Sequence, residues 1–331
     1  MCWHPGPGSV TAGQRGRARR RLGHSDLRVP ACHDDQMKVR FAVAPGSAAS
    51  ADSELLAFSD AIEASGFDGI WLSDLPLAPV IDPLLGLALV AGRTTRLRLG
   101  ANVVPLGRNP FLLAKELAQL DRISNGRLLL SFVTGIGAPA EREALGLGDA
   151  GRGEVLEEVL GLVRAWWAGE TVEHTSERWS FTGLAAVARP VQDSLEVWLG
   201  GRGPKALDRV GRLADGWLGA HVTADEAHAA RERIQVSAEH AGREIDPEHF
   251  GLSIAYSRAS PDPELLRTLA ARRPDIDPLT VLPVGAAALR SAINDYVEAG
   301  LSKFVIRPSA VVESWLDESE WLADAILDLQ T

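Results

Sequence analysis

Residues 97–132 read LRLGANVVPLGRNPFLLAKELAQLDRISNGRLLLSF and combine a strand, a helix and a second strand. Asn109 and Pro110 are typical of a helix start, because asparagine accepts hydrogen bonds from free N–H groups and proline needs none at the first position. Asn125 and Gly126 are typical of a helix end, since both residue types adopt the left-handed conformation there. The closing run RLLLSF is mostly apolar, as in a strand of a parallel sheet covered on both faces. The stretch therefore predicts a strand–helix–strand unit of a parallel sheet.

The same alternation extends over the rest of residues 37–331. Strands are predicted at 38–44, 69–73, 97–104, 127–132, 195–199, 217–220, 250–256 and 303–307, and helices at 53–65, 83–92, 152–168, 223–241, 285–299 and 313–329, with two more starting at Pro110 and Pro204. We expect a hairpin over the barrel at 170–191 and a loop with a short helix at 257–283. Eight strands, each followed by a helix, predict a (β/α)₈ TIM barrel rather than an open doubly wound sheet. No G-x-G-x-x-G motif follows the first strand, which argues against a dinucleotide-binding fold.

Residues 1–36 differ from the rest in composition. They contain six arginines and three acidic residues, a net charge of 6 − 3 = +3, and show no hydrophobic periodicity. We therefore expect a disordered tail, or natural translation from Met37, with residues 37–331 as a single domain. A nucleic-acid-binding arm is the alternative. No apolar stretch follows Arg19-Arg20-Arg21, so no signal peptide is predicted and a cytoplasmic protein is expected.

Composition excludes several classes of function. Lys plus Arg is 34 and Asp plus Glu is 44, so the net charge of 34 − 44 = −10 argues against a general nucleic-acid binder. No run of about 18 apolar residues is present, and no transmembrane helix or membrane partner is expected. The two cysteines, Cys2 and Cys32, precede residue 37, which excludes thiolate catalysis in the rest of the chain. No spacing of His, Asp and Glu is typical of a metal site, and no metal is predicted.

Functional residues of a TIM barrel lie at the C-terminal ends of its strands. In this chain those positions are Ser73-Asp74, Asn102 to Arg108, Thr134-Gly135, Gly200 to Gly203 and His221. Asp74 either accepts hydrogen bonds from a ligand or caps the next turn. Arg108 either pairs with a ligand phosphate or forms a salt bridge with a nearby acid.

The cluster Gly200-Gly201-Arg202-Gly203 is the strongest candidate for binding an anion. Its glycines let backbone N–H groups approach a ligand closely, and the N-terminus of a helix follows. The alternative is a tight turn that needs glycine for steric reasons alone. His221 is the histidine predicted at the barrel rim, where it could protonate a substrate near neutral pH. Since no other acid–base machinery is evident, a cofactor is expected to carry the reaction.

Four stretches together resemble the luciferase-like monooxygenase superfamily. They are GFDGIWLSD at 66–74, LGANVVPLGRNPFLLAKELAQLDRISNGRLLLSFVTG at 99–135, REALGLGDAGR at 142–152 and PVQDSLEVWLGGRGPKALDRVGRLADGW at 190–217. The resemblance covers essentially all of residues 37–331. It implies a TIM barrel that binds FMN or the deazaflavin coenzyme F420, and the actinobacterial F420-dependent branch is the most similar.

The resemblance also assigns residues to the cofactor. It implies that Asp74 contacts the deazaflavin, that Thr134 and Gly135 line its ring, and that Gly200 and Gly201 hold its phosphate. Further candidates for cofactor binding are Asn102, Val103, Val104, Arg108, Arg202 and Gly203. The first three of these are expected to form a bulge behind the ring, where relatives often have a non-prolyl cis peptide bond.

Two positions depart from the sugar-phosphate dehydrogenases of this superfamily. Leu75 stands where they have a proton-donating histidine, and Ile136 stands where they have a glutamate. We therefore do not expect a sugar phosphate as substrate, and the apolar side chains favour a small, apolar organic molecule.

The resemblance thus implies an F420-dependent oxidoreductase that transfers a hydride between the deazaflavin and its substrate. An FMN-dependent monooxygenase and a non-catalytic protein that binds the flavin or deazaflavin are the alternatives. The segments 136–151, 170–191 and 257–283 are expected to set the substrate, and a homodimer is a possible assembly.

Overall fold

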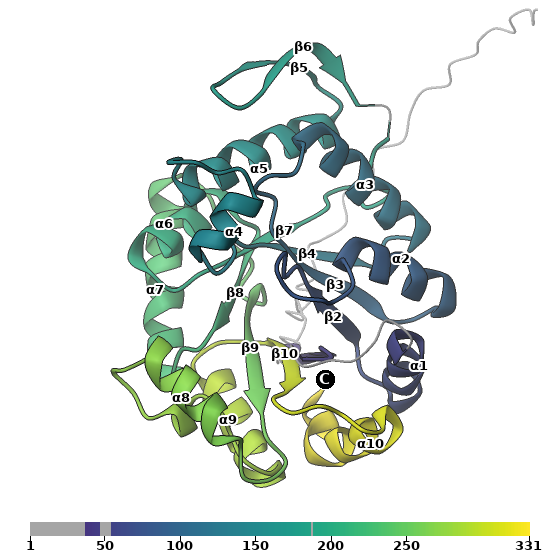
Figure 1. Ribbon diagram of the computed structural model, residues 1–331, viewed down its shortest axis with the longest axis vertical. Helices are drawn as coiled ribbons and strands as arrows, with labels where there is room; N and C mark the ends of the chain where they lie inside the picture. The colour runs from purple at the N-terminus through teal and green to yellow at the C-terminus, as the bar shows by residue number, and fades with distance from the viewer. Residues whose placement is uncertain (1–36, 47–53, 187) are drawn as a thin grey trace, which may run out of the picture. The chain divides into compact units, whose positions relative to one another are not determined.

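Eight parallel strands close into a barrel in the part of the chain that the computed structural model describes, residues 37–46, 54–186 and 188–331. Their order around the barrel is β1-β10-β9-β8-β7-β4-β3-β2 (Figure 1). The strands are β1 (Arg40–Val43), β2 (Gly69–Ser73), β3 (Arg98–Val103), β4 (Leu128–Phe132), β7 (Val197–Gly200), β8 (Gly216–Ala220), β9 (Phe250–Tyr256) and β10 (Lys303–Pro308). The expectations about residues 1–36 lie outside the described residues.

Helices surround this barrel on its outer side (Figure 1). They are α1 (Leu55–Ser65), α2 (Pro83–Arg93), α3 (Pro110–Ile123), α4 (Pro139–Ala144), α5 (Arg152–Ala168), α6 (Pro204–Leu213), α7 (Ala224–His240), α8 (Pro263–Arg272), α9 (Ala286–Glu298) and α10 (Trp315–Ile326), with 3₁₀ turns at Pro278–Thr280 and Leu327–Leu329. The predicted TIM barrel is confirmed, and each of the eight predicted strands is present. None of the described helices is long and apolar enough to cross a membrane.

Local signals in the sequence account for the helix boundaries. The Asn109 side chain accepts hydrogen bonds from the N–H groups of Phe111 and Leu112 at 3.0 and 3.1 Å, so α3 begins at Pro110. Gly169 follows α5 with a φ of 84°, a conformation that favours glycine. Helix α4, inside the 136–151 segment, is an element that the sequence patterns did not predict.

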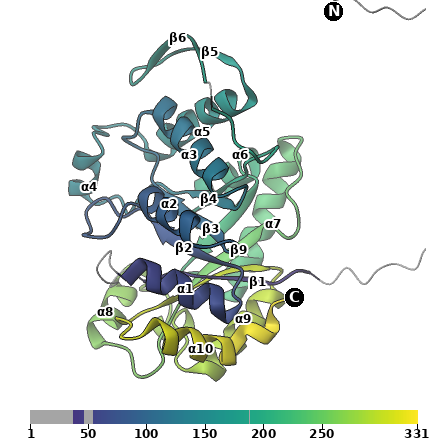
Figure 2. The same ribbon diagram turned by 90° about the vertical axis from the view of Figure 1, so that its right-hand side faces the viewer.

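The predicted hairpin exists, but it does not lie over the barrel. Strands β5 (Thr171–Thr175) and β6 (Ser180–Ala185) pair antiparallel and pack on the outer side of α5 (Figure 2). The indole N–H of Trp166 in α5 donates to the carbonyl of Leu184 at 2.8 Å, and the ring of Phe181 meets the Trp166 ring edge-on at 5.1 Å. A buried tryptophan on the outer face of α5 holds the hairpin there, away from the mouth of the barrel.

Two tryptophans fill the barrel interior, and glycines on neighbouring strands leave room for them. A Cβ at Gly100 would lie 1.9 Å from Cε3 of Trp71, and a Cβ at Gly216 would lie 2.5 Å from Cε2 of Trp198. Side chains alternate between the two faces of a strand, so both rings point inward from β2 and β7. They form a layer across the barrel below the C-terminal ends of the strands.

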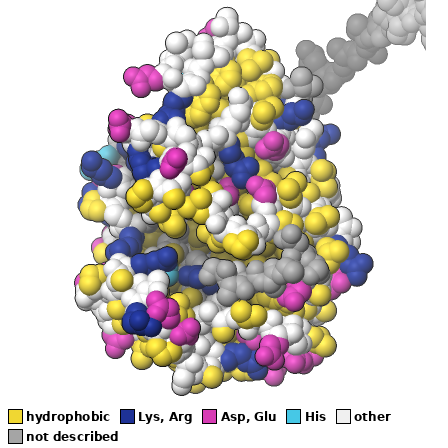
Figure 3. Space-filling view, in the orientation of Figure 1, with side chains coloured by type: hydrophobic (Ala, Val, Ile, Leu, Met, Phe, Trp, Pro, Cys, Tyr) yellow, Lys and Arg dark blue, Asp and Glu magenta, His cyan; other side chains and the backbone are white. Residues whose placement is uncertain are grey.

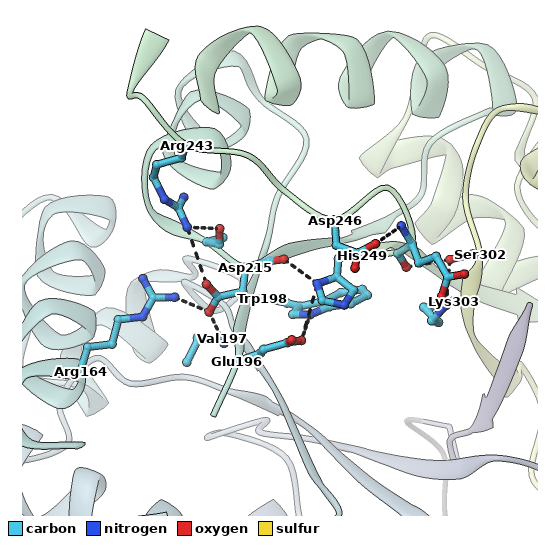
Figure 4. Close-up of polar contacts among 12 residues, drawn as sticks. Arg164, Glu196, Val197, Trp198, Asp215, Arg243, Asp246, His249, Ser302 and Lys303 are labelled. Carbon is cyan, nitrogen blue, oxygen red and sulfur yellow. Dashed lines mark hydrogen bonds and ion pairs between the residues drawn. The ribbon is translucent and has the colours of Figure 1, made fainter. Parts of the chain in front are cut away.

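Asp215 stabilises the N-terminal end of the barrel (Figure 4). Its carboxylate accepts a hydrogen bond from the backbone N–H of Val197 at 2.8 Å and pairs with Arg164 and Arg243. Its carbonyl oxygen lies 3.0 Å from Nδ1 of His249. This network joins the starts of β7, β8 and β9 to α5 and to the segment after α7.

Candidate functional site

A cavity of about 490 Å³ opens at the C-terminal end of the barrel. Its walls come from strand ends and the loops behind them, including Ser73, Asn102, Val133, Gly200, Ala220 and Arg307. The space-filling view shows a hollow in this face, with Lys and Arg side chains gathered on one side of it (Figure 3). The cavity therefore lies at the end of the barrel where the sequence reasoning placed the site.

Four of the predicted site residues line this cavity: Asn102, Gly200, Gly201 and Arg202. Its lining does not include the others, which are Asp74, Val103, Val104, Arg108, Thr134, Gly135, Gly203 and His221. Their contacts show what each of them does in the structure.

The turn after β7 combines a conformation that favours glycine with close packing. Gly201 has a φ of +113°, and a Cβ at this position would lie 2.7 Å from Cβ of Ala206. The indole N–H of Trp217 donates to the Gly201 carbonyl at 2.8 Å, which fixes the peptide in place. Gly203 precedes α6, which has no side-chain cap. Pro204 has no N–H, and Ala206 and Leu207 donate to the Gly203 carbonyl at 2.9 and 3.0 Å, so the N–H of Lys205 is the one in the first turn of α6 without an acceptor among the described residues.

Positive charge is concentrated on the same side of the cavity. Arg202, Arg272 and Arg307 line it, and none of them forms an ion pair within 4 Å with the described residues. Arg202 donates instead to the carbonyl of Arg272 at 3.4 Å, and Arg307 donates to Oγ of Ser253 at 3.3 Å. This side of the cavity is therefore suited to an anionic group.

His221 lies among these arginines in a left-handed conformation, with a φ of 55°. Burial, followed by repulsion from Arg307, Arg272 and Arg202, lowers its pKa to about 4. The imidazole is consequently neutral at pH 7, and the expected protonation of a substrate near neutral pH is not supported. These arginines come from the turn after β7, the end of α8 and β10, so the sequence around His221 does not indicate them.

Asp74 and Arg108 pair with each other. Arg108 donates to the carboxylates of Asp74 and Asp82, both at 2.8 Å, and the N–H of Val104 donates to Asp74 at 3.2 Å. Although burial alone raises the pKa of Asp82, its hydrogen bond and ion pair with Arg108 lower it overall. Of the two roles considered for Arg108, the structure shows the salt bridge, which holds the loop between β2 and α2 against β3.

The predicted bulge is absent. Val103 pairs with Phe132 in regular parallel register, both Val103 and Val104 are buried, and all peptide bonds of the described residues are trans. The carbonyls of Thr134 and Gly135 accept hydrogen bonds from Arg152 at 3.2 and 3.1 Å. These contacts turn both residues toward α5, while their neighbours Val133 and Ile136 line the cavity.

Beneath the cavity, polar atoms are buried without partners among the described residues. They are Oδ1 of Asn102, Oγ of Ser131 and Nε1 of Trp71. Asn102 pairs with Ser73 on one side and with Ser131 on the other in the strand register, and its Nδ2 donates to Oγ of Ser73 at 3.0 Å. Ser73 and Asn102 line the cavity, whereas Ser131 is fully buried behind them. Because buried polar atoms normally have hydrogen-bond partners, Oδ1 of Asn102 is available to the polar edge of a ligand.

A second cavity, of about 330 Å³, lies at the opposite end of the barrel. Its charged groups pair with each other or with neighbours. Arg40 lies 3.8 Å from Asp68, Lys303 lies 3.5 Å from Glu248, and His249 lies 3.6 Å from Glu196. Paired charges at this end are typical of residues that stabilise a barrel. Among the described residues, no group of His, Cys, Asp and Glu is arranged to hold a metal ion.

Sequence reasoning missed Ser253, Arg272 and Arg307. A signal for Arg307 was present in the sequence. This arginine is a charged residue that directly follows the apolar residues 304–306 and stands before Pro308, at the C-terminal end of the strand. Arg272 ends α8 in a segment predicted only as a loop with a short helix, so nothing local placed it at the cavity.

Comparisons with known proteins agree with this architecture. Residues 37–299 match the family model described as luciferase-like monooxygenase. A 5,10-methylenetetrahydromethanopterin reductase of Methanolobus tindarius is 29% identical over 210 residues, 63% of this chain and 62% of that protein. An F420-dependent glucose-6-phosphate dehydrogenase of Nakamurella multipartita is 29% identical over 223 residues, 63% of this chain and 64% of that protein. The chain thus spans less than two thirds of the length of these relatives.

The fold of this chain is also similar to that of a solved structure. An F420-dependent secondary alcohol dehydrogenase in complex with an F420–acetone adduct superposes with a TM-score of 0.75 and covers 89% of this chain and 100% of that one. Its sequence is 17% identical, so this likeness concerns the fold alone.

Proposed function

Because the chain belongs to the luciferase-like monooxygenase family, we propose that it is an oxidoreductase that uses coenzyme F420 bound at the C-terminal mouth of the barrel. The observation that carries the proposal is the turn at Gly200 and Gly201, whose backbone lines the cavity beside Arg202. The name of the Nakamurella relative, which states F420 dependence, supports the choice of cofactor.

The residues present fit a molecule with a flat polar ring and a phosphate. Asn102 offers its buried Oδ1 to one edge of a ring, and Leu72 and Val133 supply apolar walls. At the other side, Gly201 permits a close approach to the backbone, and Arg202 adds positive charge. This arrangement suits the ring of a deazaflavin at the first position and its phosphate at the second.

The chemistry belongs to the cofactor, and the chain supplies binding and exclusion of water. When bound, the deazaflavin supplies a carbon that gives or accepts a hydride. The Gly200-Gly201 turn orients the cofactor through its phosphate, and Asn102 fixes the plane of the ring. Apolar residues of the loop after β2, Leu75, Val80 and Ile81, line the cavity and keep water away from this face.

An FMN-dependent monooxygenase is the second candidate, because the matched family is described by that activity. FMN also carries a phosphate and a tricyclic ring, and the same turn would hold its phosphate. Fluorescence titration of the purified chain with each cofactor separates the two proposals. We expect tight binding of F420 and weak binding of FMN, whereas tight binding of FMN alone would contradict the F420 proposal.

Turnover tests the remaining alternative, a non-catalytic carrier. The protein is loaded with chemically reduced F420 and mixed with a broad panel of ketones, aldehydes and activated alkenes while the absorbance of the cofactor is followed. Oxidation of the cofactor by any member of the panel supports an enzyme. No oxidation across the panel by a protein saturated with cofactor would favour a carrier.

A further inference from the structure

Arg307 is a cation that the cofactor's phosphate turn does not need. It lies on the inner face of β10, two residues beyond Val305, and lines the cavity. Its Nε donates to Oγ of Ser253 at 3.3 Å, and no carboxylate of the described residues lies within 4 Å of it. Burial and the charge of Arg272 lower its pKa. A guanidinium removed from water without a counter-charge is costly, and this cost is offset when an anion binds.

Three other arginines that are at least partly buried have polar partners, whereas Arg231 has a buried Nε without one. Arg108 pairs with Asp74 and Asp82, and Arg273 pairs with Glu226 and Asp275. Arg127 donates to four backbone carbonyls and to a threonine hydroxyl. Arg307 differs from these three, because its hydrogen bond to Ser253 is weak and it has no carboxylate partner among the described residues.

Positive charge predominates around Arg307: Arg202 and Arg272 line the same cavity, and among the described residues the one carboxylate in its lining is that of the exposed Glu54. Arg272 faces it from the end of α8 at a distance where the two repel each other, and it lines the same cavity. The neutral His221 stands next to both, so the positive field here comes from the guanidinium groups alone at pH 7. The cavity lining also includes the apolar side chains of Leu72, Ile81 and Ile136.

We propose that Arg307 and Arg272 bind an anionic group, a carboxylate or a phosphate, of the substrate that shares the cavity with the cofactor. The inference rests on the proposed function and names its substrate class. It changes the expectation of a purely apolar substrate, since the substrate would have an apolar body near Ile81 and Ile136 and a charged group at Arg307. Phosphate and carboxylate present the same oxygens to a guanidinium, and the experiment separates them.

The test measures binding of three small probes, phenyl phosphate, benzoate and neutral benzyl alcohol, by isothermal titration calorimetry. Each probe is titrated into the protein with and without saturating F420. Wild-type protein, Arg307→Gln, Arg307→Lys and Arg202→Gln are compared. Arg267→Gln is the matched control, because Arg267 is an exposed arginine of α8, the helix that carries Arg272.

With F420 bound, the wild type should bind phenyl phosphate or benzoate at least about 10-fold more tightly than benzyl alcohol, because hydrogen bonds between charged groups are the stronger ones. Arg307→Gln should remove that preference and leave affinity for F420 within about 3-fold, while Arg307→Lys should retain part of the preference. Arg267→Gln should change neither affinity. The preferred probe identifies the anion as a phosphate or a carboxylate.

Two results would overturn the proposal. One is an anionic probe that binds no more tightly than benzyl alcohol. The other is a combination of two observations: Arg307→Gln loses as much affinity for F420 as Arg202→Gln does, and F420 displaces the anionic probe. Arg307 would then bind the cofactor and not the substrate. If F420 itself does not bind, the proposed function fails separately, and Arg307-dependent binding of the anion to the cofactor-free protein still decides this proposal.

Discussion

Replacing Gly201 by alanine is expected to weaken cofactor binding strongly. The φ of +113° is one that residues with a side chain rarely adopt, and the new Cβ would lie 2.7 Å from Cβ of Ala206. Relieving this strain, which costs on the order of 1–3 kcal/mol, requires the peptide to rotate. Rotation moves the backbone N–H groups away from the phosphate.

The magnitude follows from the hydrogen bonds that are lost. A hydrogen bond to a charged group contributes about 1.5–3 kcal/mol, which corresponds to roughly 10- to 150-fold in affinity. We therefore expect Gly201→Ala to raise the Kd for F420 at least about 10-fold in a fluorescence titration.

Gly161→Ala is the matched control. Gly161 is an exposed glycine of α5 outside the cavity lining, and a Cβ there would meet no atom within 4 Å. This variant should keep the wild-type Kd. Thermal unfolding of both variants checks that they are folded. Unchanged affinity in a folded Gly201→Ala protein would refute the assignment of the turn to the phosphate.

Three further predictions test the fold and its charges. Gly100→Ala should destabilise the protein by about 1–3 kcal/mol in urea unfolding, because the added methyl group would collide with the ring of Trp71; a stability equal to wild type would show that the ring can move aside. Asp74→Asn should lower the melting temperature, because it removes one of the two carboxylates that pair with the Arg108 guanidinium. A crystal structure of the variant should show Arg108 shifted toward Asp82, and an unmoved Arg108 would argue against the role given to this pair. In His221→Asn, the free energy of unfolding should depend less steeply on pH between pH 6.5 and pH 4 than in the wild type. The pKa of His221 in the folded state, about 4, lies below the ordinary value of 6.5, so the unfolded chain binds more protons between these two pH values. The free energy of unfolding of the wild type therefore falls as the pH falls through this window, by on the order of 2 kcal/mol at pH 5. If the free energy of unfolding falls as steeply in the variant as in the wild type, this pKa is contradicted.

The fold was predictable because its signals are local. Asn109-Pro110 and the glycine after α5 mark helix ends through contacts within a few residues, and the apolar run at 128–130 indicates a buried parallel strand. The hairpin was predicted as an element but not in its place. Its position depends on Trp166, whose partner Leu184 is distant in sequence.

The site was predictable only where one segment builds it. The turn Gly200-Gly201-Arg202 is such a segment, and it lines the cavity. The cationic side is assembled from α8 and β10, so no pattern in either segment indicates that Arg272 and Arg307 meet. The pairing of Asp74 with Arg108 is similar, because it joins the ends of two strands across 34 residues of sequence.

A crystal structure of the chain with F420 tests the central claim most directly. We expect the phosphate of F420 within hydrogen-bonding distance of the backbone at Gly200 and Gly201 and of Arg202, with the polar edge of the ring on Asn102. A phosphate bound on Arg307 instead, or a ring at the N-terminal end of the barrel near His249, would contradict it.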